Sequence, residues 1–139
     1  MIVDATNMIA GRLGAYIAKQ LLLGEKIEIV NSEKAVISGN KYDIFETYAH
    51  KTERGTHTKG PFAPKQPHLI LKRIIRGMLP HSQQKGRNAF RNLICHIGVP
   101  KALEGQQAEK LEKFNKSTLR QARTVTLKQV SEYMGIKVQ

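Results

Sequence analysis

The sequence has one cysteine, Cys95, and no tryptophan among its 139 residues. A single thiol excludes an internal disulfide and a zinc site built from several cysteines. No run of 18 apolar residues occurs, and the longest stretch without a charged side chain is the nine residues 92–100, so we expect no membrane span and no membrane partner. The N-terminus has no basic patch before an apolar run, so we expect no export signal and a cytoplasmic location.

Acidic residues are missing from the middle of the chain. Residues 54–103 hold ten Lys or Arg residues and no Asp or Glu, whereas residues 1–53 hold six basic and seven acidic side chains and residues 104–139 hold seven and four. Ten of the twelve net positive charges therefore lie in residues 54–103. A surface that serves only solubility mixes both signs, so we interpret the missing carboxylates as an adaptation to a phosphate-rich partner.

Length and composition indicate one ordinary domain, residues 1–139. Hydrophobic residues make up 40% of the chain and charged residues 24%, which is typical of a globular protein. A chain of 139 residues is long enough to bury a single core. We find no internal repeat and no low-complexity segment, so we expect one folded unit that carries the basic segment in its middle.

The first thirty residues predict a strand, a helix and a second strand. An apolar pair at residues 2–3 precedes a helical pattern over Met8–Leu23, with Asn7 as its N-cap and Gly24 as its terminator. Residues 26–30 alternate in hydrophobicity as a strand does. Such a unit normally builds a parallel sheet with a right-handed crossover, so the sequence predicts an α/β fold.

The next segment predicts a helix followed by a long loop. Ser38, Gly39 and Asn40 are turn or cap residues ahead of a helical pattern over residues 41–51. Residues 55–67 then contain two glycines and three prolines among basic residues and histidines. A loop of this length in a compact domain usually serves a function.

An amphipathic helix over residues 68–79 follows the loop and ends before Pro80. At 100° per residue, Lys72, Arg73 and Arg76 fall on one side, and the apolar residues 70, 71, 74, 75 and 78 fall on the other. The pattern predicts a helix with one core face and one ridge of three cations.

A second short helix and a strand follow. Arg87 and Arg91 lie four residues apart, with Phe90 on the opposite, apolar side of this helix. Residues 93–97 are typical of a buried strand, closed by Gly98 and Pro100. The second helix therefore repeats the design of the first.

The last forty residues are less regular. We expect residues 101–111 and parts of 114–123 to be helical or irregular, and residues 124–127 to form an edge strand. Thr126 and Gln129 have the spacing of a capping box for a helix over 127–134, which Gly135 ends.

Residues Gly11 to Gly14 invite a phosphate-binding interpretation, because they follow a strand and open a helix. Ile9 stands where a dinucleotide-binding fingerprint needs glycine, and the Gly-Lys-Ser/Thr ending of a P-loop is absent. The same four residues fit the GXXG clamp that joins two helices in KH domains, but here the apolar periodicity runs straight through them. Close packing of the helix on the sheet is the simpler explanation for both glycines.

The remaining chemistry-bearing residues form no recognisable catalytic or metal site. No two of the five histidines lie three or four residues apart, so we expect no metal site. Cys95 and His96 are adjacent in a strand and would point to opposite faces, which makes Cys95 an inert buried thiol. Glu25, Glu28 and Glu33 fit ordinary surface positions. We therefore expect no enzyme, no cofactor and no small-molecule substrate.

Structured RNA is the polyanion that the basic middle fits best. It contains only two aromatic residues, Phe62 and Phe90, and Phe90 is on an apolar face, so a base-stacking platform for single strands is not expected. Cations on rigid helices, with a loop that follows a groove, suit recognition of RNA by backbone and shape. The spacing of the two helices over residues 68–92 fits a DNA-binding helix-turn-helix. The first helix is the more basic one, which argues against this interpretation.

Several short motifs of the sequence closely resemble those of a universal family of large-subunit ribosomal proteins, the family numbered thirteen, in its archaeal and eukaryotic form. The resemblance covers most of the chain. Its marks in this sequence are Val3-Asp4-Ala5, Gly11-Arg12-Leu13, Ala18-Lys19, Gly24, Val30-Asn31, Ser38-Gly39-Asn40-Lys41, Gly60-Pro61, Arg76-Gly77-Met78-Leu79-Pro80, Lys85-Gly86-Arg87 and the archaeal-type Ile97-Gly98-Val99-Pro100.

The resemblance implies a three-layer α/β/α fold around a small, mainly parallel sheet of about four strands. It also implies a non-enzymatic, structural role in the large subunit, where the partners are ribosomal RNA and neighbouring proteins. The RNA-binding residues that we infer from the basic segment and the family motif are Arg54, Lys59, Lys65, Lys72, Arg73, Arg76, Gly77, Lys85, Arg87 and Arg91.

Three questions stay open at this point. Gly77 either lets a phosphate approach the backbone closely or ends its helix. The rival functions are a nucleotide-dependent α/β enzyme that uses Gly11 to Gly14, and a polyanion or membrane-surface binder without a defined partner. The tail from Gly105 onward departs from the bacterial pattern of the family, so we assign no function to its cations.

Overall fold

A small parallel sheet lies at the centre of the fold. The computed structural model describes residues 1–120 and 123–138. The sheet has the strand order β1 (Ile2–Asp4), β2 (Ile27–Val30) and β4 (Leu93–Cys95). Its register places Val3 opposite Ile29 and Ile29 opposite Cys95. The strand–helix–strand prediction for the first thirty residues is therefore confirmed, and the sheet has three strands where about four were expected.

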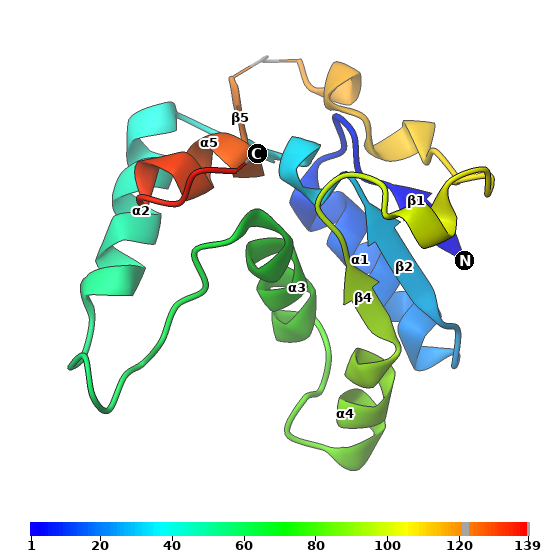
Figure 1. Cartoon of the computed structure of the whole chain (residues 1–139), viewed down its shortest axis with the longest axis horizontal. Helices are drawn as coiled ribbons and strands as arrows, with labels where there is room; N and C mark the ends of the chain where they lie inside the picture. The colour runs from blue at the N-terminus through cyan, green and yellow to red at the C-terminus, as the bar shows by residue number, and fades with distance from the viewer. Residues whose placement is uncertain (121–122, 139) are drawn as a thin grey trace.

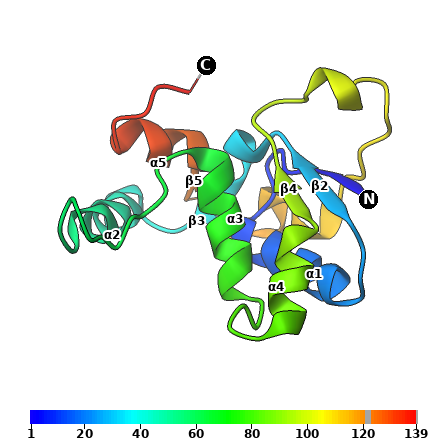
Figure 2. The ribbon, with the colours of Figure 1, turned by 60° about the horizontal axis from the view of Figure 1, so that its bottom comes forward.

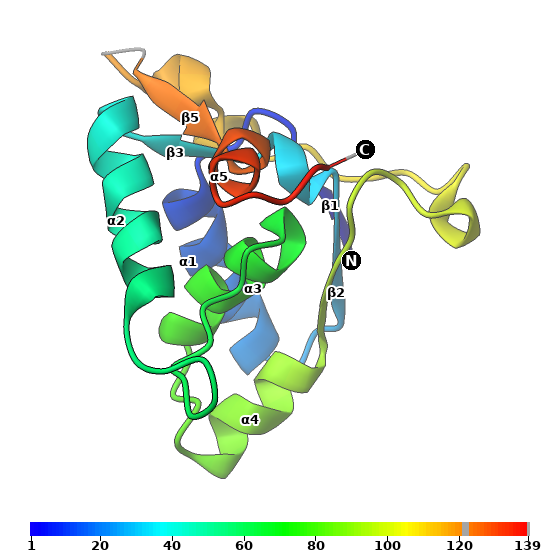
Figure 3. The same ribbon diagram turned by 60° about the vertical axis from the view of Figure 1, so that its left-hand side comes forward.

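The main core fills the space between this sheet and two helices. Helices α1 (Ala10–Leu22) and α3 (Pro67–Gly77) pack against each other on one face of the sheet (Figures 1 and 3). Alternate strand residues face these helices and are buried, whereas Ile94 points to the other face and is 46% exposed. This mixed α/β architecture agrees with the predicted three-layer class, although strand 93–97 is shorter and less buried than expected.

A second, two-stranded sheet joins the first third of the chain to its C-terminal part. Strands β3 (Val36–Ser38) and β5 (Thr124–Thr126) pair antiparallel, and helix α5 (Leu127–Tyr133) follows directly. The capping box is confirmed, because the Thr126 hydroxyl accepts from the Gln129 backbone and the Gln129 side chain accepts from the Thr126 backbone. The sequence did not predict β3, because a strand of three residues shows no alternation that could be recognised.

Helix α2 (Lys41–Glu53) begins as predicted, with the Asn40 side chain accepting from the Tyr42 backbone N–H. The predicted cap of α1 is wrong. Asn7 adopts a left-handed backbone with φ 60°, and Ile9 occupies the N-cap position without a side-chain bond. The Asn7 N–H instead donates to the Lys34 carbonyl, so this residue fastens a turn to a neighbouring segment and does not cap the helix.

The segment after Gly98 lies along the edge of β1. The Glu109 backbone bonds to Ile2 and Asp4, so this edge strand is covered. Three 3₁₀ turns, Lys101–Leu103, Glu112–Phe114 and Lys116–Thr118, are the regular pieces of the described tail. These turns match the helical or irregular character expected for residues 101–111 and parts of 114–123. Residues 121–122 lie outside the described residues. Among residues 1–120 and 123–138, no helix has both the length and the apolar character to cross a lipid bilayer.

Candidate nucleic-acid interface

Helix α3 connects the core to the basic surface. Ile70, Leu71 and Ile75 are fully buried, as the helical pattern predicted. Ile74 is only half-buried, and Met78 is 40% exposed, so the predicted core face was too wide. The helix ends at Gly77 and Met78 is its C-cap, and the Met78 side chain still reaches the contact with Gly14 of α1.

The three cations of α3 do not form one ridge, which corrects the prediction. The Lys72 ammonium lies 5.2 Å from the centre of the Phe90 ring on α4 (Gln84–Arg91). The Arg73 guanidinium points the other way and donates to the Phe62 carbonyl at 3.4 Å. Arg76 is half-buried, and its Nε has no hydrogen-bond partner among the described residues. Tertiary neighbours on both sides of α3 draw these long side chains apart.

Helix α4 lies beside α3 (Figure 2) and carries a second group of cations. Lys85, Arg87 and Arg91 are all exposed, and Arg87 donates to the Gln84 side chain at 3.1 Å. Gly86 lets the helix start against the preceding turn, because a Cβ there would collide with the Pro80 carbonyl. The two helices of the predicted pair are therefore confirmed.

Residues 54–66, which we call the arm, connect α2 to α3 and lie on the side of the molecule away from the sheet (Figure 1). Thr56 and Gly60 exchange two backbone hydrogen bonds and close a tight turn, with exposed Lys59 inside it. Exposed Lys65 lies nearer α3, and its carbonyl accepts from the Ser131 hydroxyl of α5 at 2.7 Å. The predicted long loop is confirmed, and α5 fastens its second half.

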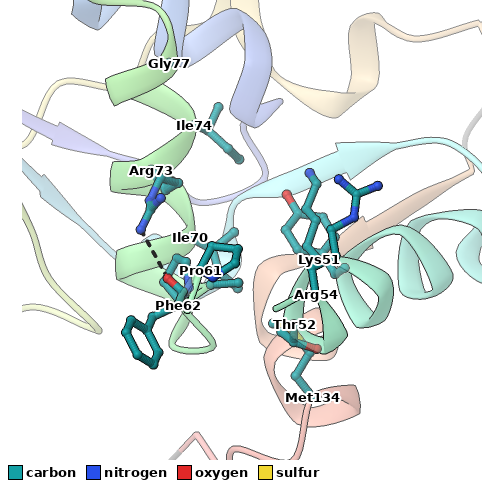
Figure 4. Close-up of a pocket in the computed structure, with 13 residues that line it drawn as sticks. Lys51, Thr52, Arg54, Pro61, Phe62, Ile70, Arg73, Ile74, Gly77 and Met134 are labelled. Carbon is teal, nitrogen blue, oxygen red and sulfur yellow. Dashed lines mark hydrogen bonds between the residues drawn. The ribbon is translucent and has the colours of Figure 1, made fainter. Parts of the chain in front are cut away.

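A pocket of about 440 Å³ opens between α2, the arm and α3 (Figure 4). Arg54 and Arg73, which are far apart in the sequence, both line it, together with Lys51 from the last turn of α2. Sequence reasoning missed Lys51, because the basic segment was counted from residue 54. Its position three residues before Arg54 on a helix was the signal that could have found it.

The ten predicted site residues are all accessible. Lys72 and Arg76 are half-buried and the other eight are exposed. Arg54 and Arg73 meet at the pocket, Lys72 lies beside α4, and Lys59 projects from the arm. Within residues 1–120 and 123–138, none of these side chains forms an ion pair with a carboxylate. Their charge is therefore available to an external anion.

The glycine predictions have mixed outcomes. Gly77 ends α3 with an ordinary helical backbone, so it is not a left-handed terminator, and open space surrounds the site where its Cβ would be. Gly14 is buried where α1 crosses α3, with Ile75 and Met78 close by. Gly11 is exposed and has no close neighbour. Close packing therefore explains Gly14, although α1 packs there against helix α3 and not against the sheet. Close packing does not explain Gly11.

The thiol and the carboxylates serve the fold. Burial raises the pKa of Cys95 to about 12, so the prediction of an inert buried thiol is confirmed. The expectation of ordinary surface positions holds for Glu25, which is exposed, and for Glu28, whose side chain is 37% exposed, and it is wrong for Glu33, which is buried. Glu28 lies 3.0 Å from the His96 ring on the open face of the sheet, and the buried Glu33 carboxylate accepts the Gly98 N–H at 3.0 Å. In the described part of the chain, no three His, Cys, Asp or Glu side chains group as metal ligands would.

Comparison with known proteins gives one consistent result. Residues 1–102 match the family model described as ribosomal protein L13. A protein of Archaeoglobus fulgidus named large ribosomal subunit protein uL13 is 47% identical, over 98% of this chain and 88% of that protein. Proteins of the same name from Methanosarcina barkeri and Methanopyrus kandleri are 42% and 40% identical, over 98% and 99% of this chain and 98% and 87% of their own lengths.

Proposed function

The chain belongs to the ribosomal protein L13 family, and on this basis we propose that residues 54–103 bind large-subunit ribosomal RNA and thereby support assembly of the subunit. The protein itself is a structural constituent of the large ribosomal subunit, in the cytoplasm, and it is not an enzyme. Its proposed partners are the RNA and the neighbouring ribosomal proteins.

The observation that carries this proposal is the set of ten cations in residues 54–103. Nine of them lie on helices α3 and α4 and on the arm, Lys101 begins the 3₁₀ turn Lys101–Leu103, and no described carboxylate forms an ion pair with any of them. Each cation that meets a phosphate releases condensed counterions from the RNA, which is a large source of affinity. The core face of α3 holds its cations in fixed positions, so the RNA meets a preformed surface.

Contacts to the RNA backbone and shape account for most of the proposed interface. Phe90 packs on the core, and the Lys72 ammonium covers its ring. Among the aromatic residues of 54–103, that leaves Phe62 on the arm, 67% exposed, so an extended stacking platform is not available. The cations on α3 and α4 suit the phosphates on either side of a groove in folded RNA.

The test compares two variants that each lose four positive charges. In the first, Arg73, Arg76, Arg87 and Arg91 are changed to Gln. In the matched control, the same change is made at the exposed tail cations Lys113, Lys116, Arg120 and Lys137. Tagged proteins are expressed in cells, and the lysate is washed in high salt and sedimented through a sucrose gradient.

We expect the wild type and the control in the large-subunit peak, and the first variant near the top of the gradient. In binding to isolated ribosomal RNA, the slope of log affinity against log salt falls by roughly 0.7–0.9 for each phosphate that the variant no longer neutralises. An unchanged first variant, or an equal loss in the control, contradicts the assigned surface. Displacement of the wild type by unrelated RNA at moderate salt indicates a general polyanion binder.

A further inference from the structure

We propose that the pocket between α2 and α3 receives a single unpaired base of the RNA, while Lys51, Arg54 and Arg73 hold the phosphates next to it. This inference rests on the proposed function and deepens it, because it names one nucleotide-sized subsite within the basic surface. The residues that line the pocket come from three parts of the chain, residues 48–54, residues 61–77 and Met134, which the fold brings together (Figure 4).

The walls of the pocket suit the two faces of a base. Ile70 forms the buried floor, and the half-buried side chains of Ile74, Pro64 and Met134 line the sides. The volume of about 440 Å³ lies in the range of small-molecule pockets, roughly 300–1,000 Å³. Bases extruded from RNA are held by stacking between such apolar and aromatic surfaces.

One polar group in the wall is available to the edge of a base. Tyr48 lines the pocket, and burial raises the pKa of its phenol, so the hydroxyl stays neutral and both donates and accepts hydrogen bonds. Thr52 is already engaged, because its hydroxyl donates to the Ala49 carbonyl at 2.7 Å. A planar ligand with hydrogen-bonding groups on its rim fits this arrangement better than an aliphatic side chain.

The charge of the rim identifies the ligand as a nucleotide. Lys51 and Arg54 lie on one side of the opening and Arg73 on the other (Figure 4). None of the described residues that line the pocket is Asp or Glu. A base in the pocket brings a phosphate on each side of its ribose to this rim, so the cations meet the charges that accompany it. A basic peptide segment from a neighbouring protein is repelled here.

Gly77 gives a way to fill the pocket without disturbing the core. It lines the pocket, and outside its chain neighbours and its own helix backbone no atom lies within 4 Å of the site of a Cβ, so the Cβ of Gly77→Leu enters open space. Gly11 offers the matched control, because it is also a helical glycine with no neighbour within 4 Å and lies outside this pocket. Gly11→Leu therefore makes the same chemical change elsewhere.

The experiment uses large subunits that carry the wild type, Gly77→Leu or Gly11→Leu. Dimethyl sulfate, a carbodiimide and kethoxal modify the Watson–Crick edges of accessible bases in their RNA, and primer extension locates each modification. We expect one base, or two neighbouring bases, to be protected with the wild type and Gly11→Leu and to become reactive with Gly77→Leu. Identical modification patterns in all three particles overturn the inference.

A second measurement covers the case in which Gly77→Leu does not enter the subunit. The free wild-type chain, labelled at Ile and Met methyl groups, is titrated with nucleoside 5′-monophosphates and with ribose 5-phosphate. We expect the Ile74 and Met134 signals to shift with the nucleotides and not with the base-free sugar phosphate. Equal shifts with the nucleotides and with ribose 5-phosphate, or no shifts with either, overturn the proposal that the pocket binds a base. Because sedimentation with the subunit is scored separately, failure of the pocket and failure of the RNA-binding proposal are distinguishable.

Discussion

The central sheet and the basic segment treat charge in opposite ways. Around the sheet, each buried carboxylate has a partner within the protein: Asp4 accepts from the Thr6 hydroxyl at 2.6 Å, and Glu33 accepts from the Gly98 backbone at 3.0 Å. In residues 54–103, no Lys or Arg has a carboxylate partner among the described residues. The first region pairs its buried carboxylates within the protein, whereas the second leaves its cations without a carboxylate partner.

Helix α3 belongs to both regions, which explains how they work together. Ile75 on its inner side packs against Gly14 of α1, and Arg73 on its outer side faces the pocket. The buried side chains of the inner side hold the helix in place, and the helix thereby positions the charges of its outer side. Stability and binding are therefore expected to depend on different side chains, and the four predictions below test this separation.

The largest effect is expected from Ile75→Ala. The side chain is fully buried where α1 and α3 meet, so truncation should lower the free energy of unfolding by about 2–5 kcal/mol, as measured by urea denaturation. Leu69→Ala, on the same helix but at a position that is 40% exposed, is the control and should cost much less. Equal losses at the two sites would show that the helix has no distinct inner face.

Replacing Gly86 and replacing Gly77, both in the basic segment, should have very different effects on the free energy of unfolding. Gly86→Ala forces a methyl group against the Pro80 carbonyl and should cost about 1–3 kcal/mol. Gly77→Ala enters open space at the end of a helix and should leave stability unchanged or raise it by up to about 1 kcal/mol. Thermal unfolding of both variants measures the contrast, and a destabilised Gly77→Ala protein would contradict the described geometry.

Asp4→Asn should weaken the sheet in a pH-dependent way. Burial acts to raise the pKa of Asp4, but hydrogen bonds from Thr6 and Asn31, with Lys110 nearby, outweigh it and hold the pKa below its ordinary value of 3.8. A lowered folded-state pKa stabilises the fold above that ordinary value, and the stabilisation is lost as the pH falls through the folded-state pKa.

At neutral pH we expect the variant to lose about 1–2 kcal/mol of unfolding free energy. Urea denaturation at a series of pH values should show the gap between wild type and Asp4→Asn closing in acid. A gap that stays constant below pH 3.8 would mean that the charge of this carboxylate does not stabilise the sheet.

The smallest effect on stability is expected from Arg87→Gln and Arg91→Gln. Both side chains are exposed, so each substitution should change the unfolding free energy by less than about 0.5 kcal/mol. The salt dependence of RNA binding should nevertheless become shallower. A large loss of stability with unchanged RNA binding would reverse the comparison and make these arginines part of the scaffold.

Periodicity and capping residues were enough to predict the local elements. The four-residue spacing in α1, the Asn40 cap of α2 and the Thr126–Gln129 box of α5 are signals within a single turn of chain. The parallel strands followed from the alternation of residues 26–30 and the helix before them. The family and its fold were visible as well, because their motifs are contiguous in the sequence.

Tertiary neighbours decided what the sequence did not show. The directions of Lys72 and Arg73 depend on Phe90 and on the Phe62 carbonyl, and a helical wheel contains neither. Strand β3 exists because β5, nearly ninety residues later, pairs with it. The pocket required α2, the arm and α3 at once, so only two of its three rim cations were among the predicted residues.

The hydrogen bond from Ser131 to the Lys65 carbonyl has a consequence for biosynthesis. The two residues are 66 positions apart, so the arm leaves the translating ribosome long before α5 exists to fasten it. During that interval the second half of the arm lacks this contact with α5. The hydrogen bond that fastens the second half of the arm to α5 therefore forms only after α5 has been translated.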